Sequence, residues 1–145
     1  MDYRELVFYQ KAREVIGGVN IQVKKWHMTM QSEVVARQLF RAATSVAANI
    51  AEGHGRHHGQ EYVHYLYIAQ GSANEVDHWL QTALDCKIGD TEEIRKIINL
   101  NNETRRMLTS SINSLQSKEK PGSIREDSIP YSPIPYSFEN ERLGD

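Results

Sequence analysis

A heptad pattern between about His58 and Lys87 constrains the fold of this chain more than any other feature. Seven residues follow one another there at alternating spacings of four and three: Tyr62, Leu66, Ala69, Ala73, Val76, Leu80 and Ala83. Such spacing places all seven side chains along one side of an α-helix, as in coiled coils. A helix of this length is about 45 Å long, and its apolar side needs other long helices to cover it.

A second amphipathic segment precedes it, from about Ser32 to His54. Its apolar positions and one asparagine recur at spacings of four and three: Val35, Leu39, Ala42, Val46 and Asn49. Ser32 is a residue type that caps helix N-termini, and Gly53 and Gly55 readily adopt the left-handed conformation that ends many helices. We therefore predict a helix that begins at Ser32 and ends near His54.

Two further helices are predicted, one before and one after this pair. The first covers about Tyr3–Lys25. Two glycines in its middle, at 17 and 18, each cost about 1 kcal/mol relative to alanine, so a bent helix or a strand is the alternative there. The last helix opens at Asp90, which is expected to cap it while Glu93 reaches back in a capping box. Its apolar positions continue along the segment: Ile94, Ile98, Leu108, Ile112 and Leu115.

The four predicted helices are joined by short connections, and no long run shows the alternation typical of strands. Long amphipathic helices with short connections favour an all-α, antiparallel, up-down-up-down four-helix bundle. The chain of 145 residues is long enough for one such domain and too short for two sizeable cores. We expect one bundle over residues 1–117.

Residues 118–145 differ from the rest of the chain in composition. They contain all four prolines and repeat the sequence Ile-Pro-Tyr-Ser at 129–132 and 134–137. Because proline is incompatible with a helix interior, we predict a flexible tail over 118–145. The alternative is that the repeated Ile-Pro-Tyr docks across the bundle or on a partner subunit.

The composition indicates in which compartment the protein is located and which classes of partner it is expected to bind. No apolar run approaches the roughly 20 residues that span a bilayer, and the charged N-terminus does not resemble a signal peptide. The one cysteine, Cys86, excludes an internal disulfide, so we expect a cytoplasmic protein without membrane association. The net charge is −2, and residues 1–117 hold 13 basic and 13 acidic residues. This balance is unlike the strongly basic charge of a dedicated nucleic-acid-binding protein.

The sequence lacks the common catalytic motifs. It has no glycine-rich phosphate loop, no Gly-x-Ser-x-Gly and no Cys-x-x-Cys, so we expect a non-enzymatic protein without a cofactor. Two Glu-x-x-His pairs match the spacing of di-iron bundles. Both lie on one predicted helix about 21 Å apart, so they cannot close a single site. A metal site built from Glu52, Glu61 and His64 is retained as an alternative.

An ordered series of short motifs carries a family resemblance. The stretches "RQLFRAATSVAANIAEGHGR" and "EYVHYLYIAQGSANEVDHWLQTA" resemble the four-helix-bundle proteins of the 23S ribosomal RNA intervening-sequence family. The matching positions are Gln38, Arg41, Ala42, Ala43, Ser45, Val46, Asn49, Ile50, Ala51, Glu52, Gly53, Arg56, Glu61, Tyr62, Ile68, Ala69, Gly71, Ser72 and Glu75. The likeness covers roughly residues 1–116, with departures at Gly17-Gly18, Phe40, Ala47 and His57-His58.

The resemblance implies an assembly as well as a fold. A relative of this family, the accessory protein of diversity-generating retroelements, forms a barrel-like homopentamer and assists a reverse transcriptase by binding it and nucleic acid. By resemblance we expect a ring-like homo-oligomer, with a pentamer favoured. It would act as an accessory or scaffold protein that contacts RNA, DNA or a reverse-transcriptase-like protein. A metal-binding bundle and a structural oligomer without a ligand are the alternatives.

Antiparallel packing of the second and third predicted helices, with a turn near 56–57, predicts which side chains meet. Arg41 comes level with Gly71 and Ser72 and within a turn of Glu75, so a buried or half-buried Arg41–Glu75 pair is expected. Nearer the turn, Asn49 comes level with His64 and Glu52 with Glu61. These four residues and Arg56 then form a polar cluster. It is interpreted mainly as structural, with an interface role as the alternative.

Several basic groups are candidates for nucleic-acid contact: Lys24, Lys25, Arg56, His57, His58, Arg95, Lys96, Arg105 and Arg106. In one subunit they predict only modest surface patches. In a ring, the same patches would be repeated around an axis and could form a belt.

Overall fold

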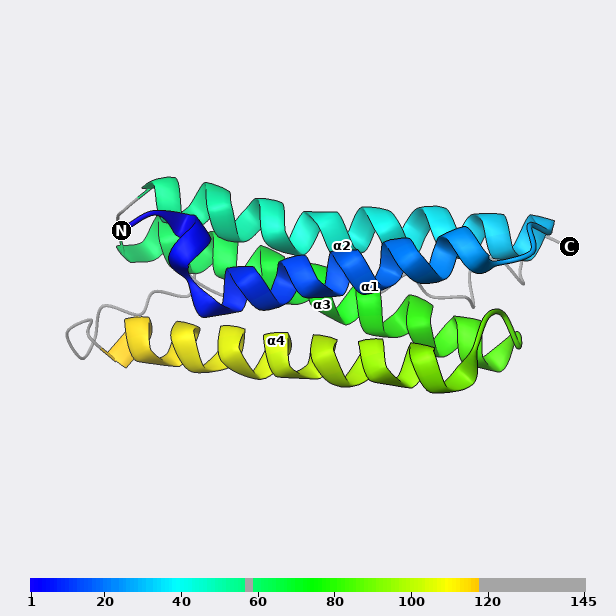
Figure 1. The fold of residues 1–145 in the computed structure, drawn as a ribbon. Coiled ribbons are helices and arrows are strands. Elements are labelled where there is room, and N and C mark those ends of the chain that lie inside the picture. The colour runs from blue at the N-terminus through cyan, green and yellow to red at the C-terminus, as the bar shows by residue number, and fades with distance from the viewer. Residues whose placement is uncertain (57–58, 118–145) are drawn as a thin grey trace, which may run out of the picture.

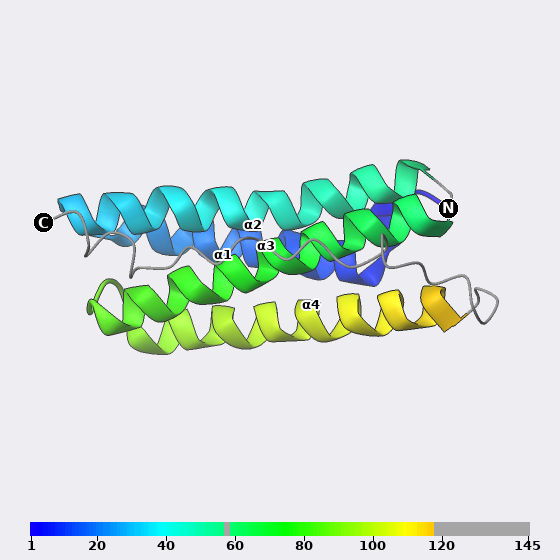
Figure 2. The ribbon, with the colours of Figure 1, turned by 180° about the vertical axis from the view of Figure 1, so that it is seen from behind.

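Four long helices form an up-down bundle in the computed structural model, which describes residues 1–56 and 59–117. A short 3-10 helix, η1 (Tyr3–Glu5), precedes α1 (Val7–Lys25), α2 (Met30–Arg56), α3 (Gly59–Asp85) and α4 (Thr91–Ser117). Helix α2 packs most extensively against α3, and α1 contacts both α2 and α4 (Figures 1 and 2). The predicted fold is confirmed. The predicted tail, with its repeats, and the His57-His58 pair lie outside the described residues.

The predicted heptad pattern forms the centre of the core. Leu66, Val76 and Leu80 of α3 are completely buried, and the three alanines of the pattern are buried with them. Only Tyr62, in the first turn of α3, is half-buried. Small and large side chains are mixed along this helix, so neighbouring helices can approach closely at the alanines and interdigitate with the larger residues.

Helix α1 is continuous through Gly17 and Gly18, so the strand alternative is wrong. The packing of α1 against α4 explains why residue 18 is a glycine. A Cβ at this position would lie 3.1 Å from Cγ1 of Ile97, whereas a Cβ at Gly17 would meet nothing within 4 Å. The missing side chain at Gly18 therefore lets α1 lie close to α4.

Helix α2 begins earlier than predicted because Thr29, rather than Ser32, occupies the capping position. The backbone N–H of Ser32 donates to Oγ1 of Thr29 at 3.2 Å, and the N–H of Thr29 donates to Oγ of Ser32 at 2.7 Å. This reciprocal pair is a capping box with serine in the third helical position. The buried Ser32 hydroxyl also donates to the carbonyl of His27 at 2.8 Å, which fixes the connection between α1 and α2.

Helix α4 shows half of the predicted capping box. The N–H of Glu93 donates to Oδ1 of Asp90 at 2.9 Å. The Glu93 carboxylate does not reach back along its own helix. It accepts hydrogen bonds from Gln22 and Lys25 of α1 instead, so it ties the end of α1 to the start of α4.

The predicted stop at Gly53 and Gly55 is wrong, because α2 continues through both glycines to Arg56. A Cβ on Gly53 would lie 2.7 Å from Cβ of Tyr65 and 3.2 Å from Cδ2 of Tyr62. Gly53 is therefore required by the close approach of α3 and not by a helix end. The longer α2 also shifts the α2–α3 pairing by about one helical turn, and Ser45 lies opposite Ser72.

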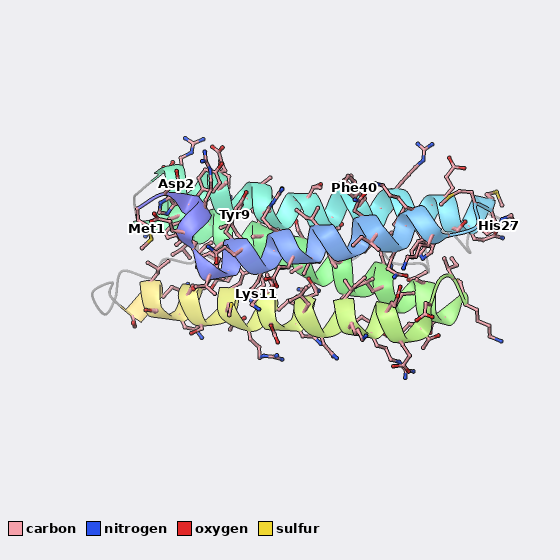
Figure 3. All side chains as sticks on the ribbon, viewed as in Figure 1. Met1, Asp2, Tyr9, Lys11, His27 and Phe40 are labelled. Carbon is pink, nitrogen blue, oxygen red and sulfur yellow. The ribbon has the colours of Figure 1, made fainter. Side chains whose placement is uncertain are left out.

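Large apolar side chains are exposed on one half of the molecule. Met1, Val7, Ile21, Met28, Met30, Val34 and Phe40 each expose 42% or more of their surface. All belong to the first 40 residues, and the described parts of α3 and α4 have none. Figure 3 shows Phe40 along α2 and His27 at the corner where α1 joins α2. No helix in the described ranges is long and apolar enough to cross a membrane.

Gly53→Ala is predicted to lower the free energy of unfolding by about 1–3 kcal/mol, because the new methyl overlaps Tyr65 and the helices must separate. Gly55→Ala is the matched control in the same last turn of α2. A Cβ there meets nothing within 4 Å, so alanine should stabilise the protein by roughly 0.5–1 kcal/mol. Urea denaturation followed by circular dichroism measures both. Equal effects of the two substitutions would contradict the close approach at Gly53.

Candidate functional site

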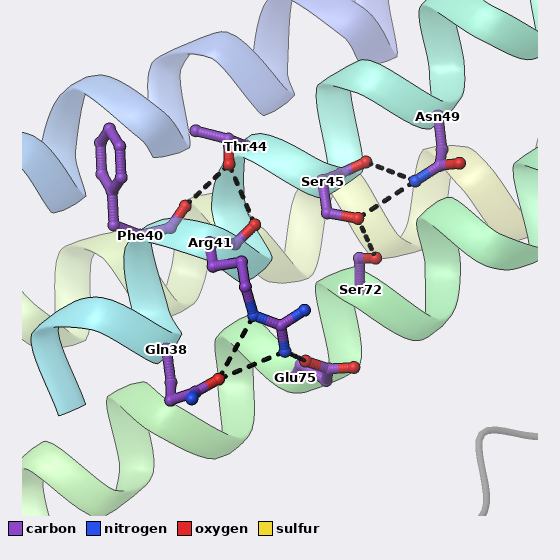
Figure 4. A network of polar contacts seen from close by, with 8 residues as sticks. All are labelled: Gln38, Phe40, Arg41, Thr44, Ser45, Asn49, Ser72 and Glu75. Atoms are coloured by element: carbon purple, nitrogen blue, oxygen red, sulfur yellow. Dashed lines mark hydrogen bonds and ion pairs between the residues drawn. The ribbon is translucent and has the colours of Figure 1, made fainter. Parts of the chain in front are cut away.

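A chain of hydrogen bonds crosses the interface between α2 and α3 (Figure 4). The hydroxyl oxygens of Ser45 and Ser72 lie 2.8 Å apart. The side-chain amide of Asn49 donates to the Ser45 carbonyl at 2.8 Å and to the Ser45 hydroxyl at 3.1 Å. Asn49 therefore belongs to the contact that joins α2 and α3 and does not meet His64, as the predicted cluster required.

The predicted Arg41–Glu75 pair forms, but it lies on the surface. Nη2 of Arg41 is 3.6 Å from Oε2 of Glu75, and the two side chains are 68% and 42% exposed. Gln38 accepts hydrogen bonds from the same guanidinium at 3.2 and 3.4 Å. Glu75 was predicted correctly as the partner of Arg41, but the predicted burial of the pair was wrong. Arg41 lies beside the buried residues of α2, and its side chain extends outward along α3. Gly71 is half-buried, and Ser72 bonds to Ser45.

Glu52 and Arg56 form a second polar group at the end of α2. Nε and Nη2 of Arg56 donate to Oε1 of Glu52 at 3.1 and 2.9 Å. The guanidinium carbon lies 5.6 Å from the ring centroid of Tyr65, and Nη2 reaches the Tyr65 hydroxyl at 3.5 Å. The hydrogen bond to Glu52 is the main cause that raises the pKa of Arg56. Tyr65 was not predicted from the sequence, although glycine at position 53 is the signal that a bulky residue faces it.

Glu61 joins neither group, and His64 touches the second group only through the ring of Tyr65, so the predicted five-residue cluster does not form. Both side chains are exposed on α3. His64 makes an edge contact with the Tyr65 ring, with centroids 5.8 Å apart. The shift of the α2–α3 pairing by about one turn explains the error, because it moves α3 residues that were expected beside Asn49 and Glu52 toward the turn.

The alternative metal site is not assembled either. Among the described residues, no group of three His, Cys, Asp or Glu side chains could hold a metal ion. Glu52, Glu61 and His64 are all described, and the carboxylate of Glu52 is occupied by Arg56.

A polar groove lies between α3 and α4. Its volume is about 730 Å³, and the residues that line it are all polar: Gln70, Asn74, Asn102, Arg105, Arg106, Thr109, Ser110 and Asn113. Nε2 of Gln70 donates to Oγ1 of Thr109 across it at 2.6 Å. The groove brings together two of the predicted basic residues with four side-chain amides that sequence analysis missed. Their signal is the recurrence of Asn, Gln and Arg at spacings of three and four on both helices.

The two arginines of the groove differ in their partners. Nη1 of Arg105 donates to Oδ1 of Asn102 at 3.0 Å and lies 4.0 Å from Oδ2 of Asp77, so this half-buried side chain is oriented by its neighbours. Arg106 is exposed and makes no ion pair with any described residue. Its guanidinium is therefore available to a ligand in the groove.

Four other predicted basic residues lie at the end of the bundle where α1 ends and α4 begins. Lys24 and Lys25 end α1, while Arg95 and Lys96 lie in the first turns of α4, and all four are exposed. Lys25 is 3.3 Å from the carboxylate of Glu93. Arg95 and Lys96 lie about 15 Å along α4 from the groove arginines, so the basic residues at this end of the bundle are separate from the groove.

The comparison with known families agrees with the motifs. The sequence profile of the family described as 23S rRNA-intervening sequence protein matches residues 4–110. The chain belongs to this family. This intervening-sequence protein is similar to a solved structure, a protein of unknown function from the S23 ribosomal protein family of Bacteroides thetaiotaomicron VPI-5482. The two share 28% identity and a TM-score of 0.63, over 73% of this chain and 98% of the other. A comparison with curated proteins finds no match.

Arg41→Gln in this intervening-sequence protein is predicted to change the free energy of unfolding by less than about 1 kcal/mol, as exposed ion pairs do. Arg37→Gln is the matched control, because Arg37 forms an exposed pair with Glu33 on the same helix. Thermal or urea unfolding compares the two. A loss of about 3–5 kcal/mol for Arg41→Gln alone is the result of breaking a buried pair and would contradict the surface position of Arg41.

Proposed function

We propose that this intervening-sequence protein is a non-enzymatic, homo-oligomeric scaffold that binds RNA in the groove between α3 and α4. The observation that supports this most is the composition of the groove, which combines two arginines with four side-chain amides and two hydroxyls. Arginine forms paired hydrogen bonds to phosphate oxygens. Amides and hydroxyls offer donors and acceptors to base edges and to the 2′-hydroxyl of ribose.

The charge balance explains why an assembly is part of the proposal. Residues 1–117 hold equal numbers of basic and acidic residues, so one protomer has little long-range attraction for a polyanion. A ring of protomers repeats the groove at fixed spacing, and one RNA strand can then occupy several grooves. Linked weak contacts of this kind raise the overall affinity by orders of magnitude.

The ring itself is proposed on the family resemblance, with five protomers favoured, and one structural feature supports self-association. Phe40 lies in the middle of α2 and is 42% exposed, pointing away from the Arg41–Glu75 pair (Figure 4). Aromatic side chains are enriched in protein interfaces, where they contribute much of the binding free energy. A reverse-transcriptase-like protein partner is the alternative ligand for the assembled surface.

Native mass spectrometry of the full-length protein, alone and with a 20-nucleotide single-stranded RNA, tests the proposal. The expected result is a pentamer that retains RNA at low salt and releases it as salt rises. The double substitution Arg105→Gln and Arg106→Gln should weaken RNA binding at least about tenfold, equal to about 1.4 kcal/mol. The matched control, Arg13→Gln with Arg37→Gln, removes the same charge outside the groove. Equal losses in both variants, or no retained RNA, would contradict binding in the groove.

Phe40→Glu is predicted to dissociate the assembly into smaller species without loss of helix content, because it places a charge in the proposed contact. Val7→Glu is the control, since Val7 is an exposed apolar residue of α1. Size-exclusion chromatography with light scattering measures the mass of each variant. An unchanged assembly in Phe40→Glu would exclude the middle of α2 as the contact.

A further inference from the structure

Four exposed apolar residues lie at the end of the bundle where α1 joins α2, and we call them the apolar corner. They are Ile21 at 56% exposure, Met28 at 50%, Met30 at 75% and Val34 at 50%. Met30 and Val34 are one helical turn apart on α2, and Ile21 is in the last two turns of α1. Large apolar residues that gather on the surface of a soluble domain commonly mark a binding surface.

The length of chain after α4 matches the distance to this corner. Helix α4 ends at Ser117, at the end of the bundle opposite the corner (Figures 1 and 2). A helix of 27 residues is about 40 Å long. Residues 118–128 can span at most about 36–40 Å when fully extended. Ile129, which begins the first Ile-Pro-Tyr-Ser repeat, is therefore among the first tail residues that can reach the corner.

The chemistry of the repeats also fits the corner. Residues 129–138, with the sequence IPYSPIPYSF, hold two isoleucines, two tyrosines and a phenylalanine between prolines. Proline-rich segments bind apolar surfaces at low conformational cost, because proline restricts the chain before it binds. Lys24 lies exposed beside the corner at the end of α1, whereas Lys25 pairs with Glu93 and Glu33 pairs with Arg37. Residues 125–145 carry five acidic and two basic residues, so their net charge is opposite to that of Lys24.

We propose that residues 129–138 of the same chain dock onto the apolar corner. The covalent link gives the tail an effective concentration in the millimolar range, so even weak contacts keep the corner covered. Docking would remove four of the seven exposed large apolar side chains of the described residues from water. It would also keep the corner from binding other copies of the protein, and it does not depend on RNA binding.

Methyl NMR of the full-length protein tests the docking directly. The chain has four methionines, and labelled methyl groups of Met28 and Met30 report on the corner, while Met1 and Met107 serve as internal references. Tyrosine rings that lie on the corner shift the methyl signals of Met28 and Met30. In the double variant Tyr131→Ser with Tyr136→Ser these two signals should move, and those of Met1 and Met107 should stay in place.

The control variant, Ser132→Ala with Ser137→Ala, changes the same repeats at polar positions and should leave all four signals unchanged. Methyl-to-tyrosine contacts within one uniformly labelled chain support docking, and these contacts should disappear in Val34→Glu. Unmoved signals for Met28 and Met30 in the tyrosine variant would overturn the proposal. Contacts seen only between chains that carry different labels would overturn it as well, because the tail of a second copy would then occupy the corner.

Discussion

The close approach of α2 and α3 is the constraint on which the rest of the structure depends. Small buried residues line both sides of this contact, among them Ala43 and Ala47 of α2 and Ala69 and Ala73 of α3. Near the turn, Gly53 has no side chain that would collide with Tyr65 of α3. Dispersion and burial both increase when backbones approach in this way, and α2 and α3 have the most extensive contact of any two helices described. The Ser45–Ser72 hydrogen bond satisfies the polar groups that this contact buries.

Several polar residues of the family motif bond within the protomer, because Asn49 bonds to Ser45 and Glu52 pairs with Arg56. Outside the motif, the side-chain amide of Asn101 of α4 donates to the carbonyl of Ala73 at 2.9 Å. A buried amide of this kind specifies how neighbouring helices align, because other alignments leave it without a partner. These residues stabilise the shape of the bundle. Among the described residues, the exposed large apolar side chains belong to the first 40 residues, and polar side chains line the groove between α3 and α4.

Much of the fold followed from the sequence, whereas the details of the site did not. Helical periodicity predicts which residues are buried, and Leu66, Val76 and Leu80 confirm it. Which residues of two helices face each other depends on where the turn between them lies. Gly53 was interpreted as a helix end, whereas its lack of a side chain allows the close approach of α3. An error of one turn moved Glu61 and His64 into a cluster that does not exist. The prediction that Arg41 pairs with Glu75 was correct despite this error, because both side chains are long enough to span one helical turn.

The pairing of α2 with α3 can be tested by disulfide formation in a chain where Cys86 is first replaced by serine. The hydroxyl oxygens of Ser45 and Ser72 are 2.8 Å apart, so cysteines at these positions should form an intramolecular disulfide under mild oxidation. Cysteines at Ser45 and Ile68 test the pairing expected from a turn near 56–57. The structure predicts rapid oxidation of the first pair and little of the second, measured by loss of free thiols. Preferential oxidation of the second pair would contradict the α2–α3 contact on which this structure rests.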